Sequence, residues 1–397
     1  MKYPYEIAIA KKFMRQITDD FSAQKKAFVV VSHINPTSVP LIQSLSHAGR
    51  IAGIIAKPNS IDYSTYERLT DKYLFLDADK HSLLQSGTAT SLLSKLPQPD
   101  EKLIIIDIGG YFAGSLGELS FLPFIGGIVE DTENGLQKYE AALEHLPNNK
   151  LPIYSIARSR AKDFEDYLIG RTIAFSAIQS IKKEKVPHWK NRKFGIIGFG
   201  EVGRGAAFCL KNTFGVDVSI YDCNPEVQQK ITLSGFQVSS RNNIIKNSEI
   251  LLCATGHGSL HDEDIQFIKK GCYIASCTSA DDEFAFRDFD IRKGQNSPYR
   301  TSMINGINFI NCGNAVNFMH PDRLERMLSP YIYLTHSALL AAIAELETQK
   351  NINTAQIQIL SPQREKKLIN DFHAINKTFN RNSIFIDKFL TATKGRL

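Results

Sequence analysis

The sequence lacks several features that mark particular classes of protein. No stretch approaches the roughly 20 apolar residues of a membrane-spanning helix. The N-terminal residues have no apolar core of the length that a signal peptide needs. The net charge is +6, but no run of five or more like charges suggests a nucleic-acid-binding arm. We therefore expect a cytoplasmic protein that binds neither membranes nor nucleic acid.

The cysteine pattern excludes two further classes. The six cysteines all lie in the second half, without a CxxC pair and without histidines at ligand spacing. Most of them fall inside apolar, strand-like runs, which is typical of reduced core cysteines in a reducing compartment. The sequence therefore predicts neither a disulfide framework nor a metal site.

Length and composition allow two domains of ordinary size. The chain has 397 residues, of which 43% are hydrophobic and 22% charged, as in soluble globular proteins. Short apolar, β-branched runs alternate with helix-length amphipathic segments along the whole chain. This alternation predicts the α/β class, with two doubly wound parallel-sheet domains.

The expected elements fall into two series. In the first half we expect strands at 27–34, 51–56, 73–76, 102–108, 126–129 and 151–156, and helices at 38–49 and 135–146. A long helix, about 160–181, and a polar linker, 182–192, precede a second series of strands at 194–197, 217–221, 249–254, 272–276 and 308–311. A further apolar helix is expected at about 333–346.

We expect three regions from this pattern. They are a substrate or catalytic domain, 1–184, completed by about 318–355; a Rossmann NAD-binding domain, 185–317; and a C-terminal helical tail, 356–397.

A glycine-rich turn carries the strongest functional signal. The segment Gly198-Phe199-Gly200-Glu201-Val202-Gly203 follows a predicted strand and opens a predicted helix. Gly198 permits a tight turn, Gly200 lets the backbone approach a pyrophosphate, and Gly203 allows the helix to pack closely on the strand. The helix N-terminus then favours the negative charge of the pyrophosphate. This context predicts a dinucleotide site that includes Glu201 and Val202.

An acid at the end of the next strand indicates which dinucleotide binds. Asp222 lies about 20 residues beyond the turn, where a carboxylate holds the ribose hydroxyls of adenosine. A carboxylate there would repel a 2′-phosphate, so NAD is favoured over NADP. A second turn, Thr255-Gly256, ends a later strand and is expected to line the same cleft.

Five segments in a fixed order resemble motifs of one family, the adenosylhomocysteinases (S-adenosylhomocysteine hydrolases). The resemblance covers roughly residues 27 to 350. It rests on Ser32–Leu45 (SHINPTSVPLIQSL), Gly127–Gly135 (GIVEDTENG), Lys162–Gly170 (KDFEDYLIG), Gly198–Gly205 (GFGEVGRG) and Gly313–Asn317 (GNAVN).

The resemblance implies a specific chemistry. Enzymes of this family use bound NAD to oxidise the 3′-hydroxyl of a nucleoside to a ketone, which acidifies the neighbouring 4′ proton. Loss of that proton drives elimination of the 5′ substituent; water then adds, and the ketone is reduced again. The cycle belongs to one-carbon metabolism and needs positioned acids and bases in a site that excludes water.

The resemblance also implies a role for individual residues. Lys162 corresponds to the base near the 3′-hydroxyl, with a pKa lowered by burial and by the cofactor's charge. Asp166, four residues later on the same helical face, would orient it. His33 would serve the 5′ position, and Asp131 would face the sugar. Thr132 would contact the nicotinamide side of NAD, and Asn317 the cofactor amide.

Several positions depart from the family pattern. Ile108 stands in place of a proton-transfer aspartate, and Tyr167 replaces an asparagine. Thr37 stands where a glutamate would recognise the adenine amino group, and Ser279 where the family has histidine. Glu133 and Asn134 replace threonines, and the ending Thr393–Leu397 lacks the tail that reaches a neighbouring subunit's cofactor.

These departures leave three hypotheses. The first is an NAD-dependent hydrolase or lyase acting on a 5′-substituted nucleoside, as a homo-oligomer, with a substrate other than adenosylhomocysteine as one option. The second is a simple NAD-linked dehydrogenase of a sugar-like alcohol. The third is a catalytically silent NAD-binding regulator.

Overall fold

The structure is a computed structural model that describes residues 4–278, 283–286, 301–316, 331–349 and 352–377. The chain divides into two compact units, Met1–Ala161 with Tyr333–Leu397, and Lys162–Ile332. Each unit is α/β with a parallel sheet, which confirms the predicted fold class. Within the described ranges, no helix is long and apolar enough to cross a membrane.

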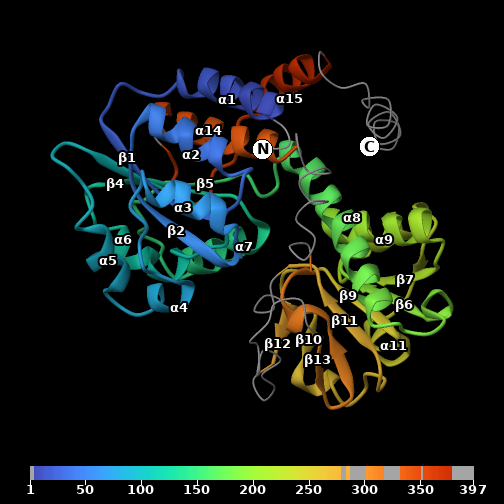
Figure 1. Ribbon diagram of the computed structural model, residues 1–397. Coiled ribbons are helices and arrows are strands. Elements are labelled where there is room, and N and C mark those ends of the chain that lie inside the picture. The colour runs from blue at the N-terminus through green and yellow to red at the C-terminus, as the bar shows by residue number, and fades with distance from the viewer. Residues whose placement is uncertain (1–3, 279–282, 287–300, 317–330, 350–351, 378–397) are drawn as a thin grey trace. The chain divides into compact units, whose positions relative to one another are not determined.

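The first unit is built on a five-stranded sheet with the order β2-β1-β3-β4-β5. All of its neighbouring strands pair in parallel (Figure 1). The β-branched side chains of β1 and β3 are almost completely buried, as expected for strands covered on both faces. The strands are β1 (Lys26–Ile34), β2 (Arg50–Ile61), β3 (Lys102–Asp107), β4 (Ile125–Glu130) and β5 (Ile153–Ser155).

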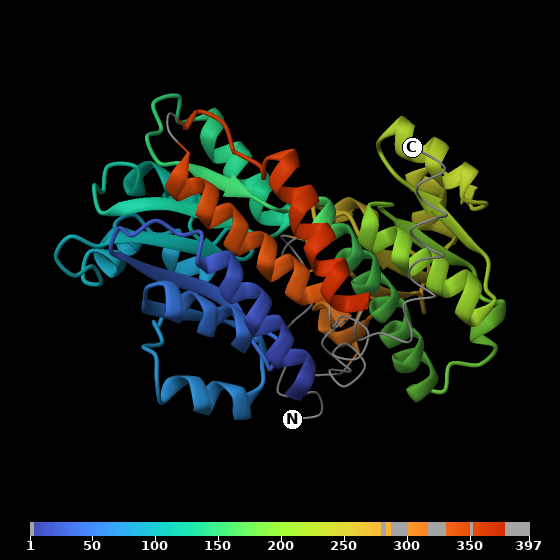
Figure 2. The ribbon, with the colours of Figure 1, turned by 90° about the horizontal axis from the view of Figure 1, so that it is seen from above.

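Helices from both ends of the chain complete this unit. In α14, alanine and leucine side chains from Leu334 to Ala344 are buried almost all round. Phe13 of α1 contacts Phe372 of α15 at a ring-centroid distance of 6.0 Å, and Figure 2 shows both helices running alongside α14. The helices include α1 (Pro4–Thr18), α2 (Val39–Ala48), α3 (Tyr63–Thr70), α4 (Lys80–Leu83), α5 (Thr88–Leu93), α6 (Leu116–Leu119), α7 (Glu133–Glu144), α14 (Tyr331–Thr348) and α15 (Pro362–Lys377).

The second unit contains a seven-stranded sheet with the order β13-β14-β11-β9-β6-β7-β8. Only β13 runs antiparallel to its neighbour in this sheet, and β10 and β12 form a separate parallel pair. The strands are β6 (Phe194–Ile197), β7 (Val218–Tyr221), β8 (Gln237–Val238), β9 (Ile250–Cys253), β10 (Leu260–His261), β11 (Tyr273–Ser276), β12 (Phe284–Ala285), β13 (Ser302–Ile304) and β14 (Ile307–Phe309).

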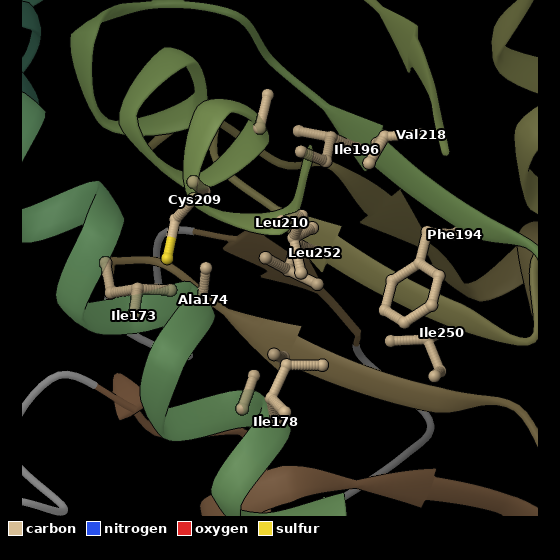
Figure 3. Packing of buried hydrophobic residues seen from close by; sticks show 14 of the residues in the cluster. Ile173, Ala174, Ile178, Phe194, Ile196, Cys209, Leu210, Val218, Ile250 and Leu252 are labelled. Carbon is tan, nitrogen blue, oxygen red and sulfur yellow. The ribbon is translucent and has the colours of Figure 1, made fainter. Parts of the chain in front are cut away.

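The long helix α8 packs in the core of the second unit. Its residues Ile173, Ala174 and Ile178 are buried against side chains of the sheet and of the helix that follows β6, including Leu210 and Leu252 (Figure 3). The sequence predicts a domain boundary after residue 184, whereas the second compact unit begins at Lys162. The helices of this unit include α8 (Arg160–Lys183), α9 (Glu201–Cys209), α10 (Pro225–Leu233) and α11 (Arg241–Asn247).

Two local expectations differ from the structure. The segment 73–76 is not a strand and contributes one isolated bridge, between Ile54 and Phe75. The predicted core position of the cysteines holds for five of them, whereas Cys223 is exposed at the end of β7. None of the six forms a disulfide.

Candidate cofactor and active-site residues

The glycine turn has the backbone geometry that a dinucleotide site requires. Gly198 follows β6 directly with a φ of +98°, a region that favours glycine. A Cβ atom there would lie 2.5 Å from the carbonyl oxygen of Ala254. At Gly203, a Cβ atom would lie 2.1 Å from the carbonyl oxygen of Gly198. Both glycines are therefore required so that α9 can start close to the strand.

Gly200 differs from its neighbours because the space beside it is open. It is the N-cap residue of α9, and among the described residues no heavy atom beyond its own chain neighbours and helix backbone lies within 4 Å of the position that its Cβ would take. The helix N-terminus thus presents its first N–H groups next to an empty position, as pyrophosphate binding requires. The turn fits NAD on this observation.

The Asp222 side chain is hydrogen-bonded to the glycine turn. Its Oδ2 accepts a hydrogen bond from Phe199 N at 2.8 Å, and its Oδ1 accepts one from Asn224 N at 2.9 Å. The side chain is partly exposed, and each oxygen keeps a lone pair for a ribose hydroxyl. Asp222 therefore holds the turn in place as well as offering the carboxylate that the sequence predicts.

Glu201 and Val202 contribute to packing at the start of α9. Glu201 forms an ion pair with Arg204, whose guanidinium lies 5.3 Å from the ring centroid of Tyr167. Burial raises the pKa of Glu201, and the neighbouring Arg204 opposes that shift. The carbonyl of Val202 faces Gly170 of α8, where a Cβ atom would lie only 1.9 Å from the oxygen.

A second close contact fixes α8 against α9. A Cβ atom at Gly205 would lie 2.0 Å from the carbonyl oxygen of Tyr167. The two helices therefore touch backbone to backbone through a glycine on each side. The start of α8 consequently has a fixed position relative to the glycine turn.

Lys162 lies on the first turn of this same helix. The residue is 5% exposed, so its amine is not in bulk solvent. Its Nζ lies 3.6 Å from Glu165 Oε2 and 4.0 Å from Asp166 Oδ1. The predicted partner Asp166 is present, but the buried Glu165 is closer. The i,i+3 spacing of Glu165 is the signal that could have identified it.

The Thr255-Gly256 turn follows β9 and contacts Glu283, a residue that was not predicted from the sequence. Gly256 N donates to Glu283 Oε1 at 2.7 Å, and Thr255 Oγ1 donates to Glu283 Oε2 at 3.0 Å. Glu283 is fully buried. The predicted turn is therefore built around an internal carboxylate.

In the first unit, His33 lies near the carboxyl end of β1. Its Nδ1 forms a hydrogen bond with Ser60 Oγ, close to the end of the neighbouring strand β2. The imidazole is half-buried.

Asp131 and Thr132 follow β4 at the same edge of this sheet. Asp131 is 8% exposed, and its backbone N–H donates to the Asp107 carbonyl. Thr132 is the N-cap of α7: its hydroxyl accepts from Gly135 N and donates to Glu130 Oε1 at 2.7 Å. The hydroxyl hydrogen is thereby used within the protein, so Thr132 can offer a ligand only an acceptor.

Two fully buried carboxyl groups, missed from sequence, organise this edge. Glu130 accepts from the backbone N–H groups of Gly109, Gly110 and Thr132 at 2.7–3.0 Å. Asp107, opposite it on β3, accepts from Phe112 N and Tyr139 OH. Each acid ends a buried parallel strand, and that shared position was the available signal.

Burial dominates the titration of these two acids. Burial, and secondly the Asp107 carboxyl, raise the pKa of Glu130 to about 8. Burial also raises the pKa of Asp107. Hydrogen bonds from neighbouring donors act in the opposite direction for both groups. The pair therefore retains a proton at neutral pH.

Ile108 stands in place of the family's proton-transfer aspartate, and two lysines bond to backbone carbonyls at this point of the chain. Ile108 is 3% exposed, and its carbonyl accepts from Lys57 Nζ at 2.8 Å. The next carbonyl, of Gly109, accepts from Lys138 Nζ at 3.2 Å. Asn317, Ser279 and the Thr393–Leu397 tail lie outside the described residues.

Sequence comparisons connect the chain to one family. Residues 173–324 match the model of the S-adenosyl-L-homocysteine hydrolase NAD-binding domain. The adenosylhomocysteinase of Thermoplasma acidophilum is 24% identical over 283 residues, which are 66% of this chain and 67% of that protein. The adenosylhomocysteinase of Acinetobacter baylyi is 23% identical over 259 residues, covering 57% of this chain and 54% of its own length.

A solved structure gives weaker information. The phosphoglycerate oxidoreductase of Vibrio cholerae is 12% identical, with a TM-score of 0.42 over 76% of this chain and 99% of that one. Similarity at this level decides nothing about function.

The family match and the turn geometry agree on the cofactor, which is NAD. The second unit is similar to the NAD-binding domain of S-adenosyl-L-homocysteine hydrolases, and the chain is distantly similar to adenosylhomocysteinases.

Proposed function

We propose that the chain is an NAD-dependent hydrolase or lyase. It would transiently oxidise the 3′-hydroxyl of a nucleoside and eliminate or add a 5′ substituent. One observation carries the proposal: a buried, acid-paired lysine lies on a helix that is locked to the NAD turn by backbone contact. A lysine that only paired with surface acids would have no need of burial.

In this proposal the neutral amine of Lys162 takes the proton of the 3′-hydroxyl, and Glu165 and Asp166 stabilise the ammonium that forms. NAD, when bound at the glycine turn, would supply the reversible hydride acceptor for this oxidation. Asp131 would accept the 4′ proton, and His33 would give a proton to the departing 5′ group and take one from the entering water. Proton transfer by such groups contributes about 10²- to 10⁴-fold each.

The departures bear on the substrate. Thr37, in the position of an adenine-recognising glutamate, has its hydroxyl bonded to Asn35 Oδ1 at 2.6 Å. Changing a buried polar partner is an effective way to change which substrate is accepted. We therefore propose a 5′-substituted nucleoside other than S-adenosylhomocysteine as the substrate, acted on by a homo-oligomer.

Exchange of the 4′ hydrogen tests the reaction directly. Nucleosides incubated with purified protein in D₂O should gain deuterium at C4′ without net accumulation of NADH. Lys162→Ala should abolish the exchange, whereas Lys183→Ala, an exposed lysine at the other end of α8, should retain it. Stoichiometric NADH accumulation with an alcohol would instead establish a dehydrogenase.

A second function is favoured by the buried Ile108. Without a carboxylate there, and with the Thr132 hydroxyl hydrogen donated internally, the chain would be a catalytically silent NAD-binding regulator. Failure of every tested nucleoside to reduce the bound NAD or to exchange its 4′ hydrogen would favour this reading.

A further inference from the structure

One buried carboxylate lies under the loop that follows β9. Glu283 has no exposed surface. Both of its oxygens accept hydrogen bonds, and the donors come from the β9 loop and from the end of β11. They are Thr255 N, Thr255 Oγ1, Gly256 N, Ser259 Oγ and Thr278 Oγ1.

Two of these donors form an anion cradle. The backbone N–H groups of the consecutive residues Thr255 and Gly256 converge on one carboxylate, and Gly256 has the positive φ of +65° typical of such turns. Loops of this kind commonly bind a phosphate or another external anion. Here the protein's own carboxylate fills the cradle, so the loop has a fixed shape before any ligand binds.

The strand order indicates which part of NAD meets this loop. In a doubly wound sheet the dinucleotide crosses the edge where the order reverses, here between β6 and β9. Asp222, at the end of β7, marks the adenosine side. The loops after β9 and β11 lie on the opposite side of β6, so they serve the nicotinamide half.

We propose that Glu283 is a positioning residue for the nicotinamide half of NAD. By filling the cradle it orders the Thr255–Ser259 loop, and it leaves the pyrophosphate to the glycine turn alone. The proposal rests on NAD binding by the second unit. It does not depend on the proposed hydrolase reaction, and it would stand if the chain proved catalytically silent.

The geometry shows why glutamine cannot replace this residue. Oε1 accepts from Gly256 N, and Oε2 accepts from Thr255 N. A glutamine side chain has one oxygen and one NH₂ group, so in either orientation its NH₂ would face a backbone N–H, which cannot accept. One of the two loop amides would lose its partner.

Binding of NAD and of ADP by Glu283→Gln tests the proposal, because ADP lacks the nicotinamide half. Calorimetry should show at least a fivefold weaker affinity for NAD and an ADP affinity within twofold of the wild-type value. If Glu283 only stabilised the fold, its replacement would weaken the affinities for NAD and ADP equally. Equal weakening of both, or no weakening of either, would overturn the proposal.

A milder variant covers the possibility that Glu283→Gln does not fold. Thr278→Val removes one donor to Oε1 and keeps the carboxylate. It should weaken NAD binding about two- to threefold and leave ADP binding unchanged, and parallel or absent changes would refute the proposal. Glu249→Gln is the matched control: this carboxylate accepts from Lys193 N just before β9, at the opposite end of the same strand, so neither affinity should change.

Discussion

At the carboxyl edge of each sheet, a buried glutamate binds backbone N–H groups, but the electrostatic surroundings of the two glutamates differ. In each unit a fully buried glutamate accepts from the N–H groups of two consecutive residues, Gly109 and Gly110 at Glu130, and Thr255 and Gly256 at Glu283. Glu130 shares its surroundings with a second buried acid, Asp107, whereas Glu283 is surrounded by hydroxyl donors. The Glu130–Asp107 pair retains a proton near neutral pH, so the charge of this pair changes with pH. In both units, therefore, a buried carboxylate orders a loop at the carboxyl edge of the sheet.

The largest expected effect is on the contact between α8 and α9 in the second unit. Gly170→Val should lower the free energy of unfolding by about 3 kcal/mol or more, because the added carbons would overlap the Val202 carbonyl. Urea denaturation measures the change. A loss below about 1 kcal/mol would show that α8 and α9 can separate without cost.

Removal of the first unit's glutamate should be nearly as severe. Glu130→Ala leaves the N–H groups of Gly109, Gly110 and Thr132 without their acceptor, at about 1–3 kcal/mol for each group that stays unsatisfied. We expect a loss of about 2–4 kcal/mol in urea denaturation. ADP affinity should stay unchanged, since the glycine turn belongs to the other unit. A variant as stable as the wild type would contradict the role assigned to Glu130.

Asp222 should affect the cofactor more than the fold. Asp222→Ala removes a charged acceptor for the ribose and the acceptor of Phe199 N. NAD and ADP affinities should fall together by about tenfold, as for one charge-assisted hydrogen bond. In Glu283→Gln, by contrast, NAD affinity should fall while ADP affinity stays unchanged. Retained ADP affinity in Asp222→Ala would mean that the adenosine side lies elsewhere.

The acid pair should make the first unit sensitive to pH. Because the folded pKa of Glu130, about 8, lies above its ordinary value of 4.5, its contribution to stability is present at low pH and is lost as pH rises through about 8. The thermal midpoint should therefore fall by a few degrees between pH 5 and pH 9. In Glu130→Gln this decline should be shallower. An identical pH profile in both proteins would exclude the pair as its source.

The smallest effect on stability is expected at Gly200. Its φ of −63° suits any residue, and no atom lies near its would-be Cβ. Gly200→Ala should change the free energy of unfolding by less than about 0.5 kcal/mol. NAD affinity should nevertheless fall severalfold, because the methyl group takes the space that the pyrophosphate needs. Unchanged affinity would place the pyrophosphate away from this turn.

The sequence was sufficient to predict the features that depend on local backbone geometry. The turn at Gly198–Gly203 and the acid at Asp222 follow from the spacing of a strand, a tight turn and a helix. The buried strands of both sheets were also predictable, because β-branched runs bounded by polar residues have few alternatives. The segment 73–76 shows the limit: it has a strand-like composition but forms one isolated bridge.

The sequence by itself therefore determined the α/β class, the dinucleotide turn and the candidate lysine of α8. Only the tertiary structure decided which acids are buried and what they hold. Glu130 and Glu283 look like ordinary polar residues in the sequence. Their importance arises because loops distant in the chain bring N–H groups to them in a buried environment. Burial and convergence of donors depend on packing, which residue spacing alone does not encode.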